Sequence, residues 1–348
     1  LEERFETAAE LLTQFEQTIK ASNKQKSTDS IRGYLSKIVE IEEALFNVIF
    51  DIKVLDPAMG SGHFLVHTVD FISDKIISFL AGYPGNPVIK KIADLKKEII
   101  GEINRQGVRI DESKLTEVNL IKRMVMKRCI YGVDLNEMAV ELAKLSLWLD
   151  SFTPGAPLSF LDHHLKCGNS LIGANLEALE KATEGQLFKI NIEPLKRAIR
   201  DMLFISSLSD ATYQQVRDLA NKYREADTSV EGYRMLLDML VSEHFGIKEA
   251  KSFLLDKGTK IDLNNLNKTI DSMPAKDKKV IEDIEKIAEK KQFFHWEIEF
   301  PEVFYKRTGE MEQKIEKKEN PGFDCVIGNP PYVNVENISK EDREYLLR

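Results

Sequence analysis

Three short segments combine residue types that could bind a ligand and act on it. The first is Asp56-Pro57-Ala58-Met59-Gly60-Ser61-Gly62, which follows an apolar stretch and precedes a helical pattern. Glycines in such a turn let the backbone approach a bound group closely. The segment contains neither the GxxxxGK[ST] phosphate loop nor the complete GxGxxG dinucleotide fingerprint. Taken alone, it is better explained as a tight connection between a strand and a helix.

The second candidate is Asp134, the last residue of the apolar segment CIYGVD (129–134). A carboxylate at the carboxyl end of a strand can accept two hydrogen bonds from ribose hydroxyls. A helix N-cap explains Asp134 equally well when the residue is considered alone. However, Asp56 and Asp134 would end two strands at the same edge of a parallel sheet. Open α/β folds bind ligands along that edge, which favours a binding role.

The third candidate, Asn329-Pro330-Pro331-Tyr332, follows directly on the apolar segment FDCVIG (323–328). The prolines hold the residues before them extended, so the Asn329 side-chain oxygen and the Pro330 carbonyl would point at one place. Two fixed acceptors suit an amino group with two N–H donors, and Tyr332 offers a flat face for stacking a planar ring. A proline-rich turn with an incidental tyrosine is the alternative. The strand context and the two upstream sites favour the functional interpretation.

The elements around these segments alternate as in a parallel α/β sheet. Apolar strands are predicted at 52–56 and 129–134, near 164–168, and at 323–328. Helical periodicity follows the first strand, with an inward face made of Leu65, Val69, Ile72, Ile76 and Leu80. A helix capped by Asn136 follows the second strand, and the residues predicted to face inward there are Met138, Leu142, Leu145 and Leu149.

Composition excludes several classes of protein. The 348 residues are 43% apolar and 30% charged, a globular balance, and no apolar run reaches the roughly 18–20 residues of a membrane helix. The N-terminus lacks an apolar signal core, and three cysteines lie far apart, so a cytoplasmic protein without disulfides is predicted. The net charge of −8 is unusual for a protein that coats nucleic acid. Residues 89–128 carry eleven Lys and Arg against six Asp and Glu, and we interpret this run as a solvated helical face.

Two further features receive structural interpretations. His163-His164 is predicted to form a polar turn rather than a metal site, because no carboxylate or cysteine stands at ligand spacing. Cys325, within the last predicted strand, is expected to be a small core residue.

The segments DPAMGSG, YGVDLNEMAVELAKLSLWL, CGNSLIG and FDCVIGNPPYV, in this order, resemble the AdoMet-dependent N6-adenine DNA methyltransferases. The order, with the cofactor motif before NPPY, is that of their gamma class. The sequence is most similar to the long methyltransferases of type IIG restriction–modification systems and of BREX-type phage resistance. The resemblance covers about residues 51–174 and 293–335. It implies a Rossmann-like class I methyltransferase sheet with N-terminal helices and a large helical insertion.

The resemblance also implies roles for individual residues. S-adenosyl-L-methionine (AdoMet) would lie with its methionine and ribose part along Asp56, Pro57, Ala58, Gly60 and Gly62. Asp134 would bind the ribose hydroxyls, Leu135 would pack on the cofactor adenine, and Asn169 would accept a bond from the cofactor's amino group.

For the substrate, the resemblance implies an adenine that is flipped out of double-stranded DNA and stacked on Tyr332. Asn329 and Pro330 would accept hydrogen bonds from its N6 amine, and Pro331 would line the base. Methyl transfer would be direct, without a metal.

The resulting domain organisation has four parts: an N-terminal helical segment (1–50), the cofactor-binding half of a methyltransferase domain (51–174), a helical insertion (175–292) in which 187–192 is a short strand, and a catalytic NPPY segment (293–348). The domain looks truncated, and the target-recognition domain of the family is absent from it. Restriction or defence-complex subunits are expected partners. Two alternatives stay open: a protein-glutamine N5-methyltransferase, whose substrate is also a planar amide NH₂, and a non-catalytic AdoMet-binding subunit of a defence complex.

Overall fold

The computed structural model of the protein describes residues 1–25, 27–107, 111, 113, 115–183, 193–205, 210–258, 261–263, 266–308, 314–333, 336 and 338–347. The predicted strand at 187–192 lies outside the described residues. Within them, no helix is both long enough and apolar enough to cross a membrane.

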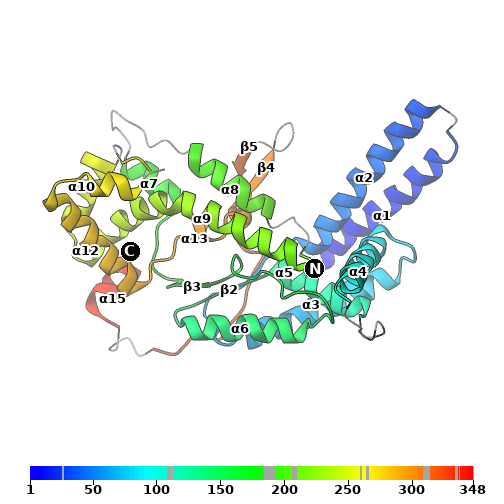
Figure 1. The fold of residues 1–348 in the computed structure, drawn as a ribbon, viewed down its shortest axis with the longest axis horizontal. Helices are drawn as coiled ribbons and strands as arrows, with labels where there is room; N and C mark the ends of the chain where they lie inside the picture. The colour runs from blue at the N-terminus through cyan, green and yellow to red at the C-terminus, as the bar shows by residue number, and fades with distance from the viewer. Residues whose placement is uncertain are drawn as a thin grey trace.

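A parallel sheet with strand order β3-β2-β1-β6 lies at the centre of the fold (Figure 1). Its strands are β1 (Val54–Asp56), β2 (Ile130–Asp134), β3 (Leu165–Cys167) and β6 (Cys325–Val326). The prediction of a parallel α/β sheet is therefore confirmed, although β6 is shorter than the predicted 323–328. The last strand in the sequence pairs with the first, which brings the segment after β6 beside the end of β1.

Successive strand residues point to opposite faces of this sheet, and each face has its own core. Val54 and Ile130 join a large core that includes the inner face of α3 (His63–Ala81). The predicted inward residues of this helix, from Leu65 to Leu80, are all buried. The opposite face carries a smaller core made of Leu55, Tyr131, Val133, Phe294, Phe300 and Val303.

Two helices precede the first strand and form an antiparallel hairpin. The hairpin is α1 (Glu2–Ser22) and α2 (Thr28–Phe50), and it projects from the body of the protein (Figure 1). Between β1 and β2 the chain adds α4 (Pro87–Arg105) and α5 (Glu117–Cys129). Helices over the N-terminal 50 residues were predicted and are confirmed.

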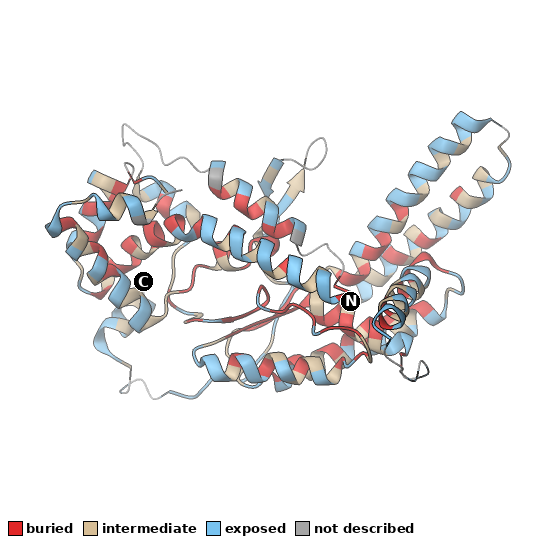
Figure 2. Cartoon of the chain, viewed as in Figure 1, coloured by how far each residue is buried: buried red, intermediate tan, exposed pale blue. Residues whose placement is uncertain are grey.

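The helix α6 (Glu137–Asp150) follows β2, and Asn136 caps it as predicted by accepting a hydrogen bond from the Met138 N–H at 3.0 Å. The predicted inward face is wrong. Val140, Ala143 and Leu147 are the buried residues, and the exposed side chains are Met138, Leu142, Leu145 and Leu149. The small Ala143 lets α3 and the turn after β1 approach α6 closely, whereas the four larger side chains are exposed. Figure 2 shows exposed positions along α6.

The region between β3 and the last strands is helical and has a core of its own. Its helices are α7 (Leu176–Ala182), α8 (Glu193–Ile205), α9 (Tyr213–Ser242), α10 (Glu249–Lys257), α11 (Leu266–Asp271) and α12 (Ala275–Lys291). The 30-residue α9 packs against α8, α10 and α12. The helices agree with the predicted insertion at 175–292, whose limits as a domain remain a prediction.

The chain then returns to the sheet through short elements. These are α13 (Trp296–Glu299), α14 (Pro301–Phe304), the antiparallel hairpin of β4 (Tyr305–Thr308) and β5 (Lys314–Lys317), and, after β6, α15 (Lys340–Leu346). Glu299 in α13 is held by two cations from distant segments: Lys166 Nζ lies 2.6 Å from its Oε2, and Arg234 Nε lies 3.0 Å from its Oε1.

Two expectations about single residues are corrected. Cys325 is exposed, not part of a core, because β6 is the edge strand among the described strands and its outer side is uncovered. His163 and His164 do lie in a turn, but both side chains are buried, with 6% and 1% of their surface exposed. Among the described residues there is no cluster that could hold a metal ion.

The ion pairs of Glu299 predict an acid-sensitive step in stability. Burial raises the pKa of Glu299, but Lys166 and Arg234 outweigh burial and hold it at about 2, below the ordinary value of 4.5. A lowered pKa means that the contribution to stability is complete above pH 4.5 and is lost as the pH falls toward 2. We expect Glu299→Gln to cost about 3 kcal/mol of unfolding free energy at pH 7, because the buried Lys166 loses its carboxylate partner and Arg234 keeps only Asp227.

Urea unfolding of wild type and Glu299→Gln at pH 7, 5 and 3 measures this effect. The difference between the two proteins should shrink as the pH falls. Glu16→Gln is the matched control, because the Glu16 side chain is 66% exposed in its pair with Lys20. Its difference from wild type should stay near zero at every pH. A Glu299→Gln difference that is independent of pH would contradict the assignment.

Candidate functional site

The carboxyl ends of the parallel strands bring the predicted site residues to one edge of the sheet. Asp56 ends β1, Asp134 ends β2, and Asn169 stands two residues after β3. The segment after β6 lies alongside β1 at this edge, because the Ile327 N–H donates a hydrogen bond to the Leu55 carbonyl at 2.8 Å. This edge is where open α/β sheets bind ligands.

The turn after β1 is held against β2 by the carboxylate that was expected to bind ribose. Gly60 N–H donates to Asp134 Oδ2 at 2.8 Å, and Met59 N–H donates to the Val133 carbonyl at 3.0 Å. Gly60 and Gly62 have φ values of 54° and 81°, which favour glycine. A Cβ at Gly62 would also lie 3.0 Å from the Cβ of Ala143. The two glycines therefore shape the turn.

Asp134 can both cap a helix and bind a ligand, the two roles considered for it from the sequence. Its Oδ1 accepts the Asn136 N–H at 2.9 Å, so the residue does organise the start of α6. Each of its oxygens accepts one backbone N–H, and a carboxylate has about four lone-pair sites in all. Two acceptor positions thus remain toward the sheet edge, where the residue is half-buried.

Asp56 is buried, with 1% of its surface exposed, and its Oδ1 accepts the Ala58 N–H at 3.1 Å. Burial raises the pKa of its carboxyl above the ordinary value; the Ala58 N–H opposes this shift, and the Asp134 carboxylate adds to it. The backbone of Gly328 lies against this carboxylate, since a Cβ there would be 2.6 Å from Asp56 Oδ1. The segment that leads to Asn329 therefore touches the turn of the first strand.

Asn169 is fixed by a segment that the sequence did not point to. Its Oδ1 accepts the Leu171 N–H at 3.1 Å, and its own N–H donates to the Gln292 carbonyl at 2.7 Å. Gln292 follows α12 and has a φ of 52°, a left-handed conformation that is uncommon for a residue with a side chain. The end of the helical region thus positions the loop after β3.

Gly168 and Gly173, in the segment CGNSLIG, indicate the contact between the loop after β3 and the residues after α12. The sequence analysis did not use this signal. A Cβ at Gly168 would lie 2.5 Å from the Phe294 ring, and one at Gly173 would lie 1.9 Å from the Phe294 carbonyl oxygen. Phe294 N–H also donates to the Ile172 carbonyl at 2.7 Å. Glycines on both sides of Asn169 indicate the close approach of another chain segment.

Gly173→Ala should therefore destabilise the protein. The new methyl group meets backbone rather than a movable side chain, so we expect a loss of about 2–3 kcal/mol of unfolding free energy. Gly101→Ala is the matched control, because Gly101 lies inside α4 with nothing within 4 Å of its Cβ position. It should stabilise the helix by about 0.5–1 kcal/mol. Equilibrium unfolding of both variants tests the contact, and equal effects would argue against it.

The predicted substrate residues are exposed at this edge. Asn329, Pro330, Pro331 and Tyr332 all lie on the surface, and Tyr332 is 99% exposed. Leu135, predicted to pack on a cofactor ring, is 55% exposed and directly follows the Asp134 carboxylate. An exposed apolar side chain thus stands next to Asp134 in the sequence, and the Tyr332 ring is open to solvent.

This donor and acceptor set fits AdoMet. A diol needs free acceptors, which Asp134 supplies, and an adenine ring needs an apolar face, which Leu135 supplies. The Asn169 side-chain oxygen accepts one N–H and retains capacity for another. The glycine turn leaves open space at Gly60, where no atom lies within 4 Å of a Cβ position.

A model of the Eco57I restriction-modification methylase family matches residues 128–348, more than half of the chain. The chain belongs to this family. The matched region includes Asp134, Asn169 and the NPPY segment, whereas the glycine turn at 56–62 lies before it. The roles of individual residues in this methylase remain predictions.

One curated relative is similar over most of the chain. It is "Putative type II restriction enzyme and methyltransferase RM.MjaORFECS2P" from Methanocaldococcus jannaschii, with 27% identity over 357 residues. The match covers 92% of this chain and 25% of the relative, so the methylase chain spans about a quarter of that protein's length. No solved structure matches the chain.

Proposed function

We propose that this methylase transfers the methyl group of AdoMet to the N6 amine of an adenine in double-stranded DNA. Membership of a restriction-modification methylase family supports methyl transfer to DNA. The observation that supports the choice of an amine is that Gly328, which directly precedes Asn329-Pro330-Pro331-Tyr332, lies against the Asp56 carboxylate at the edge where AdoMet would bind.

The cofactor would be held by the turn from Asp56 to Gly62, by Asp134 and Leu135, and by Asn169. When bound, AdoMet supplies an electrophilic methyl group on a sulfonium. The protein's own contribution on this side is orientation: backbone N–H groups fix the Asp134 carboxylate before any ligand arrives, so little ordering is needed on binding.

On the substrate side, the free N6 amine is a poor nucleophile, because its lone pair is delocalised into the ring. The Asn329 side-chain oxygen and the Pro330 carbonyl would accept hydrogen bonds from the two N–H groups of this amine. They would hold the lone pair of the amine nitrogen toward the methyl group. Tyr332, which is almost fully exposed, would stack on the flipped-out base. These groups act by positioning and electrostatics, and none of them forms a covalent bond to the substrate. The amine would gain the methyl group as the bond from the methyl group to sulfur breaks, and it would release one N–H proton to water.

The test is modification mapping of DNA from a host without adenine methylation that expresses the complete gene. We expect N6-methyladenine at one sequence motif and none in a host with the empty vector. N4-methylcytosine in its place would reassign the base. Unmodified DNA together with a protein methylated on a glutamine side-chain amide would favour the alternative function, a protein-glutamine N5-methyltransferase. AdoMet binding with neither product would favour a non-catalytic subunit of a defence complex.

A further inference from the structure

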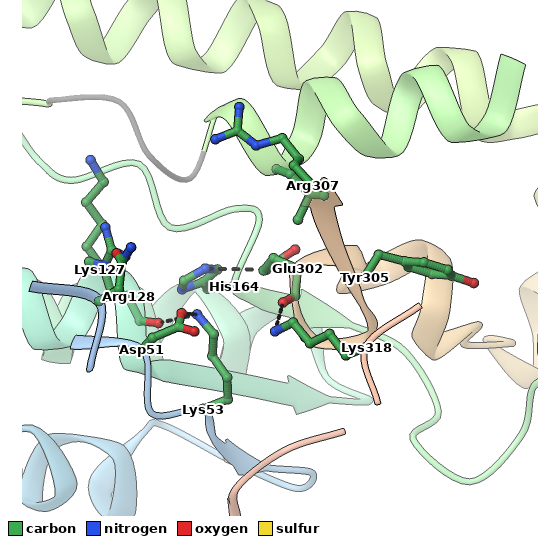
Figure 3. A pocket seen from close by; sticks show the side chains of 11 residues that line it. Asp51, Lys53, Lys127, Arg128, His164, Glu302, Tyr305, Arg307 and Lys318 are labelled. Carbon is green, nitrogen blue, oxygen red and sulfur yellow. Dashed lines mark hydrogen bonds and ion pairs between the residues drawn. The ribbon is translucent and has the colours of Figure 1, made fainter. Parts of the chain in front are cut away.

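A second site lies at the opposite edge of the sheet, where the strands begin. A cavity of about 240 Å³ is lined there by Lys53, Arg128 and His164, which immediately precede or approach β1, β2 and β3. The chain segment around β4 adds Glu302, Tyr305 and Arg307 to the lining (Figure 3). We call this the amino-edge cavity. Its remaining lining residues are Asn47, Asp51, Lys127, Leu203 and Lys318.

The lining is strongly basic although the whole chain is acidic. Five of the lining side chains are lysine or arginine, and only two are Asp or Glu. Lys127 and Arg128 end the basic run at 89–128, so the interpretation of that run as a solvated face is wrong at its end. Like charges concentrated around a small volume repel one another unless an anion lies between them.

The cations of the cavity are only partly neutralised by carboxylates. Lys53 pairs with Asp51 at 3.0 Å, and Lys127 pairs with Asp210 at 3.5 Å outside the lining. By contrast, Arg128 and Lys318 donate to neutral oxygens: Arg128 to Asn47 Oδ1 at 3.0 Å, and Lys318 to the Glu302 carbonyl at 2.8 Å. Burial and the nearby Lys53 lower the pKa of Lys318, although Asp51 opposes this, as expected for a crowded cation.

Two buried side chains at the cavity have unused polar atoms. His164 Nε2 and Glu302 Oε1 lie 3.5 Å apart, and neither atom has a well-aligned hydrogen bond with the described residues; the same is true of His164 Nδ1. His164 is 1% exposed and Glu302 is 8% exposed. Burial lowers the pKa of His164, which stays neutral, and raises the pKa of Glu302, which favours a carboxyl that donates its proton. Buried polar groups without partners indicate a missing ligand or water.

We propose that the amino-edge cavity binds a phosphoryl oxyanion of the size of inorganic phosphate or pyrophosphate. Arg128, Arg307 and Lys318 would contact its oxygens as cations, and His164 and Glu302 would donate hydrogen bonds to it. Guanidinium and ammonium groups that converge from several segments suit an anion with oxygens in several directions.

Size and position define the ligand further. The volume of about 240 Å³ leaves room for a small polyatomic anion. It is smaller than the roughly 300–1,000 Å³ of pockets that enclose larger organic ligands, so a whole nucleotide would not be enclosed. The cavity also lies at the end of the strands opposite to Asp56 and Asp134, away from the edge proposed to receive DNA. A free anion is therefore favoured over a phosphate of the DNA backbone.

The experiment is titration calorimetry of the full-length protein with pyrophosphate and with phosphate, at constant ionic strength and without AdoMet. The cavity variant is Arg128→Gln with Lys318→Gln. The matched control is Lys20→Gln with Lys340→Gln, which removes the same charge from side chains that are 73% and 88% exposed. We expect the cavity variant to bind pyrophosphate at least tenfold more weakly and the control to bind within twofold of wild type.

A parallel titration with a duplex oligonucleotide distinguishes the two sources of phosphoryl groups. Loss of duplex affinity in the cavity variant, with no pyrophosphate binding by wild type, would identify a DNA phosphate as the ligand. Equal pyrophosphate and duplex affinities in the cavity and control variants, or no binding by wild type, would overturn the proposal. Should the double variant fail to fold by circular dichroism, Arg307→Gln on the β4–β5 hairpin replaces it. Neither result depends on methyl transfer, so the proposed function is tested separately.

Discussion

Replacing Asn329 with alanine is expected to reduce methyl transfer by about 10²–10³-fold, because one of the two fixed acceptors for the target amine is lost. AdoMet affinity should stay within twofold of wild type, since Asn329 follows the strand edge and makes none of the contacts that hold the turn after β1. The measurement is transfer of labelled methyl from AdoMet to unmethylated DNA by the full-length protein, together with calorimetry of AdoMet binding.

Two comparisons sharpen the test. Asn329→Asp keeps acceptor oxygens at the same place and should retain more activity than Asn329→Ala. Asn221→Ala changes an exposed asparagine of α9, far along the chain from the site, and should behave as wild type. If Asn329→Ala transferred methyl groups at the wild-type rate, the amine-binding role of the NPPY segment would be wrong. A parallel loss of AdoMet affinity would instead indicate damage to the cofactor edge.

The main elements of this edge could be predicted because they depend on local signals. An apolar run that stops at an aspartate, followed by glycines or an N-cap, indicates a strand and the start of a helix without reference to the rest of the chain. The parallel topology then follows from the alternation of strands and helices. Asp56 and Asp134 therefore end at the same edge as expected, and Asn136 caps α6.

Contacts between distant segments could not be predicted from such signals. The outer face of α6 carries large apolar residues at helical spacing, so periodicity alone favoured it over the smaller inner face of Val140, Ala143 and Leu147. The pairing of Asn169 with Gln292 depends on how the helical region returns to the sheet. The amino-edge cavity has the same origin, because its lining residues come from segments far apart in the sequence.

The contact between Gly328 and Asp56 allows the coupling of the two halves of the site to be measured. Gly328 has a φ of 144°, and Gly322, six residues earlier, has a φ of 136°. An alanine at either position is strained by its backbone, at a cost of about 1–3 kcal/mol. Only at Gly328 does the new Cβ also meet the Asp56 carboxylate, at 2.6 Å, whereas nothing lies within 4 Å at Gly322.

Gly328→Ala should therefore weaken AdoMet binding at least tenfold relative to Gly322→Ala. It should also lose more stability, because the contact adds to the backbone strain that the two variants share. The physical reason is that Asp56 is buried and already holds the Ala58 N–H, so its carboxylate cannot move away without releasing the turn that leads to Gly60 and Gly62. Thermal unfolding and AdoMet calorimetry of the two variants, side by side, separate backbone strain from the contact. Equal AdoMet affinities of the two variants would mean that the contact between Gly328 and Asp56 does not affect the turn after β1. Contacts with other parts of the protein would then have to position the amine-binding groups.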